Sequence, residues 1–281
     1  AGGSGSAPRA ADGALLPAVV SMRHALPLAA AAAIGAVLLW RHIRRSPSLS
    51  EEERRVVAAL KAVQRRIGSR GVNLIAVSKK KPANLIAAAH GAGQADFGEN
   101  YVQEIVAKAP LLPDSVRWHF IGHLQTNKVK ELLRVPNLVC IHTVDTVKLA
   151  MEIEKRVAAQ AKAGLREIPL DVMVQVNTSG EEAKSGCTSE ACPQLCKQVQ
   201  QNCPSIRLVG LMCIGKYSAA EGDAVVDFRR LASCRRDVAA ALGVREDSIA
   251  LSMGMSHDFE AAIDEGATHV RVGSTIFGAR V

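Results

Sequence analysis

Aromatic residues make up only 3% of this 281-residue chain. Proteins that bind single-stranded nucleic acids stack bases on aromatic side chains, so this scarcity argues against such a module despite a formal net charge of +8. Residues 1–50 contain five arginines and one aspartate, which leaves 30 basic and 26 acidic residues in the remainder. Half of the net charge therefore belongs to the first 50 residues. No known nucleic-acid-binding motif is present either.

Long hydrophobic runs are also missing, and acidic residues are scarce in the leader, residues 1–47. Its apolar run, Leu26–Trp40, falls short of the ~20 residues that span a bilayer. Basic, acid-poor composition with serines is typical of an organellar targeting segment. A short membrane anchor is the alternative, and Met22 is a possible start. We expect the leader to lie outside the fold of an intracellular protein, in the cytoplasm, a mitochondrion or a plastid.

The cysteines lack C-x-x-C spacing and any paired histidine motif. Their number is odd, which suits a reducing compartment. Cys192 and Cys196 share a helical face, but packed free thiols explain that spacing better than a metal site. The seven are Cys140, Cys187, Cys192, Cys196, Cys203, Cys213 and Cys234.

Eight strand-like runs follow residue 70, and helical patterns such as Val147–Ala163, Ala191–Gln201 and Val225–Leu242 separate them. Alternation of this kind predicts a parallel sheet with helical crossovers. The fold class expected is therefore α/β, as a single-domain (β/α)₈ TIM barrel over residues 48–281. An open doubly wound sheet is the rival, but no G-x-G-x-x-G follows any strand. The runs are Asn73–Lys79, Ala95–Asn100, Val116–Gly122, Leu138–Asp145, Leu170–Asn177, Ile206–Gly215, Ser248–Ser256 and His269–Gly278.

A helix upstream of the first strand is expected to close the outer ring of the barrel. Ser50 and Glu53 have capping-box spacing at its start, and Gly71 is a candidate C-cap. Val56, Leu60, Val63 and Ile67 recur at helical spacing between them. Residues 48–70 are therefore predicted to form this helix.

The first strand-like run ends on a lysine, Lys79, and Pro82, three residues later, prevents the strand from continuing. A partly desolvated amine loses its proton more easily, and the charges of Lys80 and Lys81 act in the same direction. A neutral lysine amine is a carbonyl nucleophile, so Lys79 is a candidate Schiff-base lysine. The alternative is a solvated basic turn.

Two loops near the C-terminus have the composition of phosphate sites. They are Ser252-Met253-Gly-Met-Ser256 and Gly273-Ser274-Thr275, each after a strand-like run. Small hydroxyl residues beside glycine let backbone N–H groups approach an anion, and in barrels the loops after strands 7 and 8 commonly bind phosphate. Ordinary strand-to-helix turns are the alternative for either loop alone. Pyridoxal phosphate is the cofactor that needs both an amine and a phosphate site.

With these residues in view, the chain from Val72 to Ala279 resembles the pyridoxal phosphate homeostasis proteins, also called the proline-synthetase co-transcribed family. Its barrel is similar to the N-terminal domain of alanine racemase. The matching stretches are Ala76-Val-Ser-Lys79, Phe97-Gly-Glu-Asn-Tyr101, Trp118-His-Phe-Ile-Gly122, Val174-Gln-Val-Asn177, Ser252-Met-Gly-Met-Ser256 and Arg271-Val-Gly-Ser-Thr275. Lys80 and His257 depart from the family's pattern, but neither has an assigned role.

The resemblance implies a role for each candidate site residue. Lys79 would carry the cofactor as an internal aldimine, Asn100 would lie beside it, and Arg271 would face the pyridine nitrogen. The phosphate would be bound by Ser252, Gly273, Ser274 and Thr275, and Met253 of the same loop would also contact the cofactor.

An arginine at the pyridine nitrogen cannot supply the proton that makes the ring a strong electron sink. Racemases of this barrel type tolerate that arginine, but they use a tyrosine from a separate domain as a second acid/base, and we expect this chain to lack that domain. Tyr101 and Tyr217 are its tyrosines, and Tyr101 is expected to pack at a helix start. We therefore expect a monomeric protein that binds pyridoxal phosphate and delivers it to apo enzymes, without strong catalysis. A weak amino-acid racemase or lyase is the alternative. His119 and His123 either line the cofactor site or are ordinary core and loop histidines.

Overall fold

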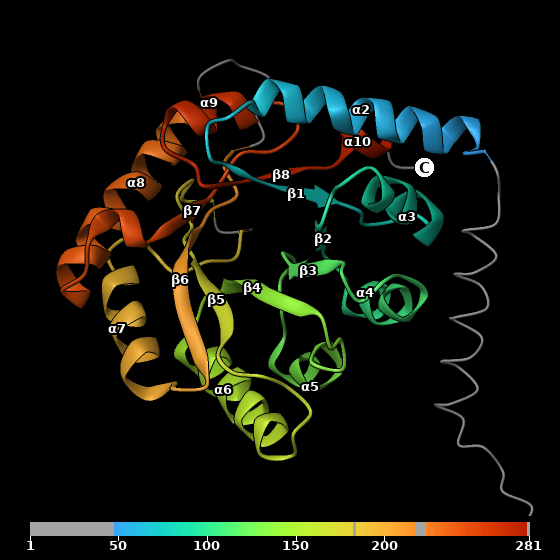
Figure 1. Ribbon diagram of the computed structural model, residues 1–281. Helices are drawn as coiled ribbons and strands as arrows, with labels where there is room; N and C mark the ends of the chain where they lie inside the picture. Colours follow the sequence, from blue (N-terminus) through green and yellow to red (C-terminus); the bar gives the residue numbers. More distant parts are fainter. Residues whose placement is uncertain (1–47, 182–183, 217–222, 280–281) are drawn as a thin grey trace, which may run out of the picture.

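Eight parallel strands form a closed barrel in the computed structural model, which describes residues 48–181, 184–216 and 223–279. Each strand pairs with the next along the chain, and β1 pairs with β8 to close the ring (Figure 1). The (β/α)₈ prediction is confirmed. The predicted leader lies outside the described residues. The strands are β1 Asn73–Val77, β2 Asp96–Glu99, β3 Arg117–Phe120, β4 Leu138–Val144, β5 Leu170–Gln175, β6 Ile206–Met212, β7 Ala250–Ser252 and β8 His269–Val272.

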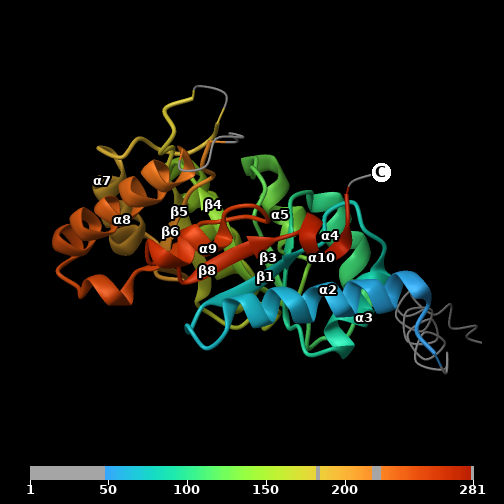
Figure 2. The ribbon, with the colours of Figure 1, turned by 90° about the horizontal axis from the view of Figure 1, so that it is seen from above.

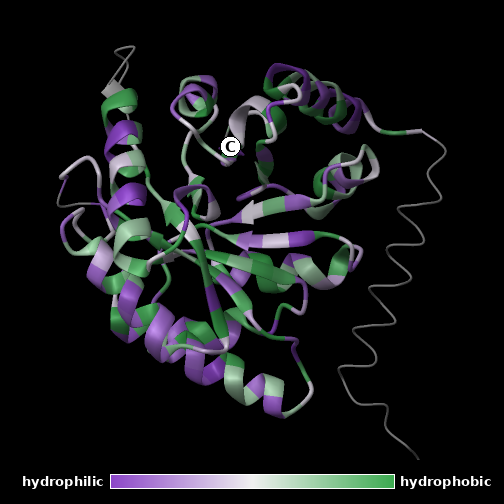
Figure 3. Cartoon of the chain, turned by 60° about the vertical axis from the view of Figure 1, so that its left-hand side comes forward, coloured by the Kyte–Doolittle hydropathy of each residue, from purple (hydrophilic) through white to green (hydrophobic). Residues whose placement is uncertain are grey.

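Helices cover the outside of the barrel (Figure 1). Their faces mix polar and apolar residues, as expected of helices that bury one side against a sheet (Figure 3). Within the described residues, no helix combines the length and apolarity needed to cross a membrane. The helices are α2 Glu51–Ile67, α3 Ala83–Gly91, α4 Val102–Lys108, α5 Val129–Leu132, α6 Val147–Lys162, α7 Cys192–Asn202, α8 Asp223–Leu242, α9 Phe259–Asp264 and α10 Ser274–Phe277.

The N-terminal helix α2 completes the outer ring, as predicted. The capping box is present: the Ser50 hydroxyl accepts from the Glu53 N–H at 3.2 Å, and the Glu53 carboxylate accepts from the Ser50 N–H at 2.8 Å. Its apolar stripe is buried, and the helix lies against α3 and α10 (Figure 2). Burial of each such side chain contributes roughly 1.5–3 kcal/mol. The buried residues of the stripe are Val56, Leu60, Val63 and Ile67.

Several helices and strands are shorter than predicted. The helix α2 ends at Gly68, with φ 64°, rather than at Gly71, because the first glycine already provides the left-handed C-cap. The eighth strand stops at Val272, since Gly273 turns the chain into the short helix α10. β1 likewise ends at Val77, so Lys79 lies in the turn after the strand.

Candidate functional site

The turn that carries Lys79 leaves the C-terminal end of β1. The Lys81 N–H donates to the Ser78 carbonyl at 3.0 Å, which makes residues 78–81 a tight turn. Lys80 adopts φ 59°, a left-handed conformation that non-glycine residues seldom use. Lys79 is half-buried between a buried serine and this exposed lysine. The turn therefore places the backbone of Lys79 directly after the C-terminal end of β1.

The two neighbouring lysines have other contacts, Lys80 through its backbone and Lys81 through its amine. The Lys80 N–H donates to the Glu104 carboxylate at 2.7 Å, and the Lys81 ammonium donates to the Ala279 carbonyl at 2.8 Å. The Lys81 amine is thus tied to the segment that follows α10. This arrangement favours Lys79 as the reactive amine.

A buried ion-pair network centred on Lys108 holds the turn at residues 78–81 in place. The Lys108 ammonium donates to the Ser78 carbonyl at 3.0 Å, to the Glu99 carboxylate at 2.8 Å and to the Glu104 carboxylate at 2.6 Å. Burial raises the pKa of Glu99, although Lys108 and Ser78 partly offset this. Glu99 is the last residue of β2, so the network ties the lysine turn to the neighbouring strand. The sequence analysis missed it.

Asn100 follows β2 at the mouth of the barrel. Its side-chain oxygen Oδ1 is buried and has no hydrogen-bond partner among the described residues. A buried amide oxygen without a partner costs free energy unless a ligand or water supplies a donor. The position thus fits the predicted contact with a polar ligand.

The loops after β7 and β8 meet at the mouth. The Ser256 hydroxyl oxygen accepts from the N–H groups of Gly273 at 3.1 Å and Thr275 at 3.5 Å, and its carbonyl accepts from the Thr275 hydroxyl at 3.3 Å. Two backbone donors therefore converge on one oxygen, the arrangement that a phosphate oxygen requires. Ser274 and Thr275 are exposed there.

Gly273 brings this cradle next to β1. A Cβ atom added to Gly273 would lie 3.2 Å from both the carbonyl oxygen and the Cβ atom of Val77. The glycine thus permits close packing of the phosphate-type loop against the strand that leads to Lys79. The loop therefore lies beside the end of β1, two residues before Lys79.

Ser252 and Arg271 face the barrel interior. The Arg271 guanidinium donates to the Ser252 hydroxyl and to the Cys213 carbonyl, both at 2.8 Å. Burial lowers the pKa of Arg271, but an arginine stays charged in proteins. Ser252 also bonds to Nδ1 of His142 at 3.1 Å. Its predicted role at the phosphate remains a prediction, and Ser256 is a second candidate for that role.

The remaining candidates are placed as follows. Met253 is fully buried in the β7 loop, beneath the surface of the mouth. Tyr101 is at the N-cap position of α4, the helix start expected for it, with 46% of its surface exposed. His119 is buried in the barrel, whereas His123 is exposed in the loop after β3. Tyr217 lies outside the described residues.

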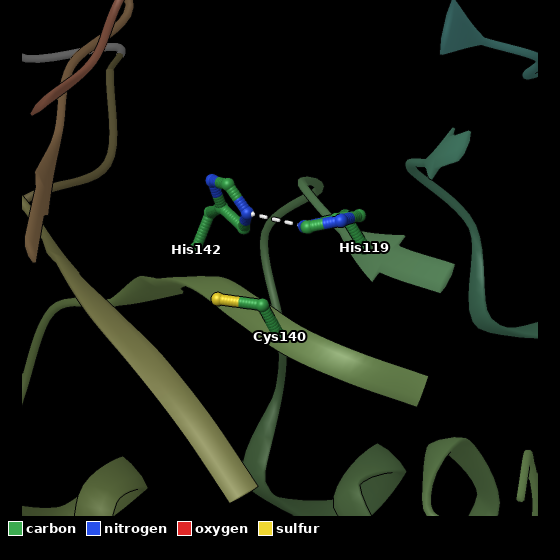
Figure 4. Close-up of side chains that lie close together, drawn as sticks. All are labelled: His119, Cys140 and His142. Atoms are coloured by element: carbon green, nitrogen blue, oxygen red, sulfur yellow. Dashed lines mark hydrogen bonds between the residues drawn. The ribbon is translucent and has the colours of Figure 1, made fainter. Parts of the chain in front are cut away.

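His119, Cys140 and His142 are close enough to suggest a metal site, with ligand atoms within 4.8 Å of one another (Figure 4). Nδ1 of His119 and Nε2 of His142 are, however, hydrogen-bonded to each other at 3.0 Å. Burial raises the pKa of the Cys140 thiol well above its usual value, which disfavours the thiolate that metals bind. The geometry is that of a hydrogen-bonded histidine pair beside a neutral thiol. The cysteines are free, and the Cys192 and Cys196 sulfurs lie 3.9 Å apart.

A cavity of about 390 Å³ lies at the other end of the barrel. It is bordered by Pro169 and Ile206, at the beginnings of β5 and β6, and by Val244 after α8. Ligands of parallel barrels bind at the C-terminal ends of the strands. The mouth that contains Lys79 is therefore the candidate site.

Comparisons with known proteins agree with this arrangement. Residues 53–281 match the family model described as the N-terminal domain of alanine racemase. The chain is 47% identical over 214 residues to the pyridoxal phosphate homeostasis protein of Mus musculus, covering 74% of this chain and 76% of the relative. It is 46% identical over 219 residues to the protein of that name from Schizosaccharomyces pombe, covering 78% and 88%.

This chain belongs to the pyridoxal phosphate homeostasis protein family. Among solved structures it is similar to PipY of Synechococcus elongatus with pyridoxal phosphate bound, at 30% identity and a TM-score of 0.66, covering 79% of this chain and all (100%) of PipY. The alanine racemase of Corynebacterium glutamicum, at 13% identity and a TM-score of 0.62, shares the fold. It covers 81% of this chain and 62% of the racemase.

Proposed function

We propose that this protein binds pyridoxal 5'-phosphate at the mouth of the barrel, as a Schiff base of Lys79, and takes part in supplying that cofactor to other proteins. The observation that carries the proposal is the packing of Gly273, one of two converging backbone donors with Thr275, against Val77, which lies two residues before the half-buried Lys79. The name of the family and the ligand in PipY support it.

The residues at the mouth fit the cofactor. Asn100 has a buried acceptor that needs a donor, and Gly273, Ser274 and Thr275 would bind the phosphate together with Ser256. Arg271 would face the pyridine nitrogen, with Ser252 and the Cys213 carbonyl fixing the guanidinium plane. When bound, the cofactor supplies an aldehyde that reacts with amines and a ring that can accept electrons.

The role of Arg271 favours binding over catalysis. Its guanidinium donates hydrogen bonds but cannot transfer a proton to the ring nitrogen, so the ring stays a weaker electron sink. Racemases of this barrel type tolerate such an arginine, but they use a second acid/base, a tyrosine, on the opposite face of the cofactor. We therefore infer a carrier function, with weak racemase or lyase activity as the competing possibility.

The test is a titration of the purified protein with pyridoxal phosphate, followed by the visible absorption of the bound cofactor and by alanine racemisation. We expect saturable binding with an imine absorption band and racemisation far below ~1 s⁻¹, the low end of ordinary enzymes. Turnover at or above that rate would contradict the carrier function. Absence of the band at saturating cofactor would contradict the Schiff base.

A further inference from the structure

A continuous chain of hydrogen bonds crosses the inside of the barrel from Arg271 to Asp96. The Arg271 guanidinium donates to Ser252 at 2.8 Å, and Ser252 bonds to Nδ1 of His142 at 3.1 Å. Nε2 of His142 bonds to Nδ1 of His119 at 3.0 Å, and Nε2 of His119 bonds to the Asp96 carboxylate at 2.7 Å. These five buried residues come from β8, β7, β4, β3 and β2.

The Asp96 carboxylate fixes the direction of every hydrogen bond in this series when both imidazoles are neutral. Asp96 can only accept, so Nε2 of His119 carries a proton, and Nδ1 of a neutral His119 must accept. His142 then donates through Nε2 and accepts through Nδ1 from the Ser252 hydroxyl. The serine oxygen in turn accepts from Arg271. Each donor in the chain therefore meets an acceptor while both imidazoles are neutral.

A second arrangement of the same chain contains one more proton. A proton arriving at the Ser252 oxygen displaces the hydroxyl proton to Nδ1 of His142. His142 passes its Nε2 proton to Nδ1 of His119. Ser252 and His142 each gain one proton and lose one, so both remain neutral. His119 becomes an imidazolium paired with Asp96, and the Ser252 hydroxyl no longer donates to His142.

We propose that Ser252, His142, His119 and Asp96 form a proton relay that takes up a proton at the Ser252 end and holds its charge on His119 at the other end. The identity of the ligand at Ser252 rests on the function proposed above, but the relay itself does not. The relay would give the barrel mouth a proton acceptor that is separate from the lysine amine.

The surrounding charges favour His119 over His142 as the final position of the proton. His142 faces the ring of His269, with 6.2 Å between centroids, and Arg271 lies beyond Ser252. Burial and these groups lower the pKa of His142 well below its usual value, and burial also lowers the pKa of His269 to about 4. His119 is instead bonded to Asp96.

Other ionisable groups around the relay do not change this assignment. Arg117 of β3 lies 3.2 Å from the Asp96 carboxylate, and its charge opposes an imidazolium at His119, but 56% of its side chain is exposed, so solvent screens that charge. The thiols of Cys140 and Cys213 are neutral, because burial raises the pKa of the first well above its usual value and that of the second to about 12. Asp258 acts on the Arg271 end and favours its charge.

The test is nitrogen NMR of the full chain with ¹⁵N-labelled histidine, without added cofactor, from about pH 8 to about pH 5. At high pH we expect both His119 and His142 to be neutral with the proton on Nε2. On acidification His119 should become doubly protonated while His142 changes to the Nδ1–H form, and both changes should share one midpoint. Separate midpoints, a charged His142, or a His142 that keeps its Nε2 proton throughout would overturn the relay.

Two variants sharpen the assignment. Asp96→Asn should abolish the coupled transition, since the imidazolium loses its carboxylate. The matched control Asp171→Asn alters a carboxylate near the beginning of β5 that pairs with Arg207 instead, and it should leave the transition in place. If Asp96→Asn does not fold, the titration of the parent protein still decides the question. A coupled transition that persists in a folded Asp96→Asn variant would contradict the proposal.

Adding pyridoxal phosphate separates the relay from the proposed function. If Ser252 faces the ligand, saturating cofactor should shift the shared midpoint, while free inorganic phosphate should not. Cofactor bound at Lys79 with an unchanged midpoint would contradict the ligand-facing end of the relay. A coupled transition without any cofactor binding would support the relay and contradict the proposed function instead.

Discussion

A Cβ atom added to Gly122 would lie 2.0 Å from the carbonyl oxygen of Asn100 and 2.7 Å from its Cα atom. The end of β3 therefore packs directly on the backbone of Asn100, and only glycine leaves room for it. The Thr143 hydroxyl also donates to the Gly122 carbonyl at 2.7 Å, which fixes the glycine from the β4 side. The position of the Asn100 amide oxygen, which has no partner among the described residues, thus depends on Gly122 having no side chain.

Gly122→Ala should displace Asn100 and weaken pyridoxal phosphate binding by roughly tenfold or more, the equivalent of about 1.4 kcal/mol. Overpacking of this kind also costs about 1–3 kcal/mol of stability. The measurement is cofactor titration beside thermal unfolding, with Gly91→Ala, where a Cβ atom meets nothing within 4 Å, as the control. Equal affinities of Gly122→Ala and the parent would contradict this account.

The Lys108 ammonium is the cation of a network with two carboxylates, so its removal leaves buried charge behind. Lys108→Met should destabilise the fold by about 3–5 kcal/mol at neutral pH. The matched control is Lys130→Met on the exposed face of α5, which should change stability by less than about 0.5 kcal/mol.

The same variant has a predictable pH dependence. Burial already raises the pKa of Glu99 in the folded protein above 4.5, and losing Lys108 raises it further. A folded carboxyl with a raised pKa binds protons more tightly than the unfolded one, so stability falls as pH rises from 4.5 towards the folded value. Lys108→Met should therefore lose more stability than the parent between mildly acidic and neutral pH. If the free energies of unfolding of the two proteins change in parallel with pH, this explanation is excluded.

Substitutions of Thr275 and Ser252 should affect the binding of phosphorylated and unphosphorylated ligands differently. Thr275→Val removes a hydroxyl from the anion cradle, a loss of about 1.5–3 kcal/mol if it bonds a charged phosphate. Binding of pyridoxal phosphate should weaken roughly ten- to hundredfold, and binding of unphosphorylated pyridoxal should not change. Ser252→Ala acts on Arg271 instead and should weaken both ligands alike. Loss of phosphate selectivity in Ser252→Ala, with Thr275→Val unaffected, would reverse our assignment.

The closing helix gives a prediction about truncation. A chain beginning at Ser48 retains the capping box and α2, so it should fold and bind the cofactor as the full chain does. A chain beginning at Gly71 loses α2 and exposes the apolar surfaces of α3 and α10 that it covers, so it should aggregate. Light scattering and melting of the two proteins provide the comparison. Indistinguishable behaviour would refute a structural role for α2.

Much of the fold could be predicted from the sequence because its signals are local. Apolar runs such as Leu170–Gln175 and the stripe of α2 indicate their own secondary structure, and loops after the last strands point to an anion site. The boundaries were less accurate, since Gly68 and Gly273 end their elements earlier than the apolar patterns suggest.

The interior network could not be predicted in the same way. Its members lie far apart in the sequence, 175 residues from Asp96 to Arg271, and they meet only because the sheet closes into a barrel. The members are Asp96, His119, His142, Ser252 and Arg271. Motifs in the sequence select Ser252 and Arg271, and His119 is a candidate, but nothing in the local sequence indicates that they form one network with His142 and Asp96. Lys108 is similar, because a lysine at the end of a helix usually lies in solvent, whereas here it reaches two carboxylates beneath the turn.

The most direct test of the proposed function is borohydride reduction of the protein loaded with pyridoxal phosphate, followed by peptide mapping. We predict a stable pyridoxyl label on Lys79, because Lys81 donates to the Ala279 carbonyl and Lys80 is exposed beside it. Lys79→Ala should remove the label, whereas Lys81→Ala should retain it. A label on Lys81 with Lys79 unmodified would contradict the account.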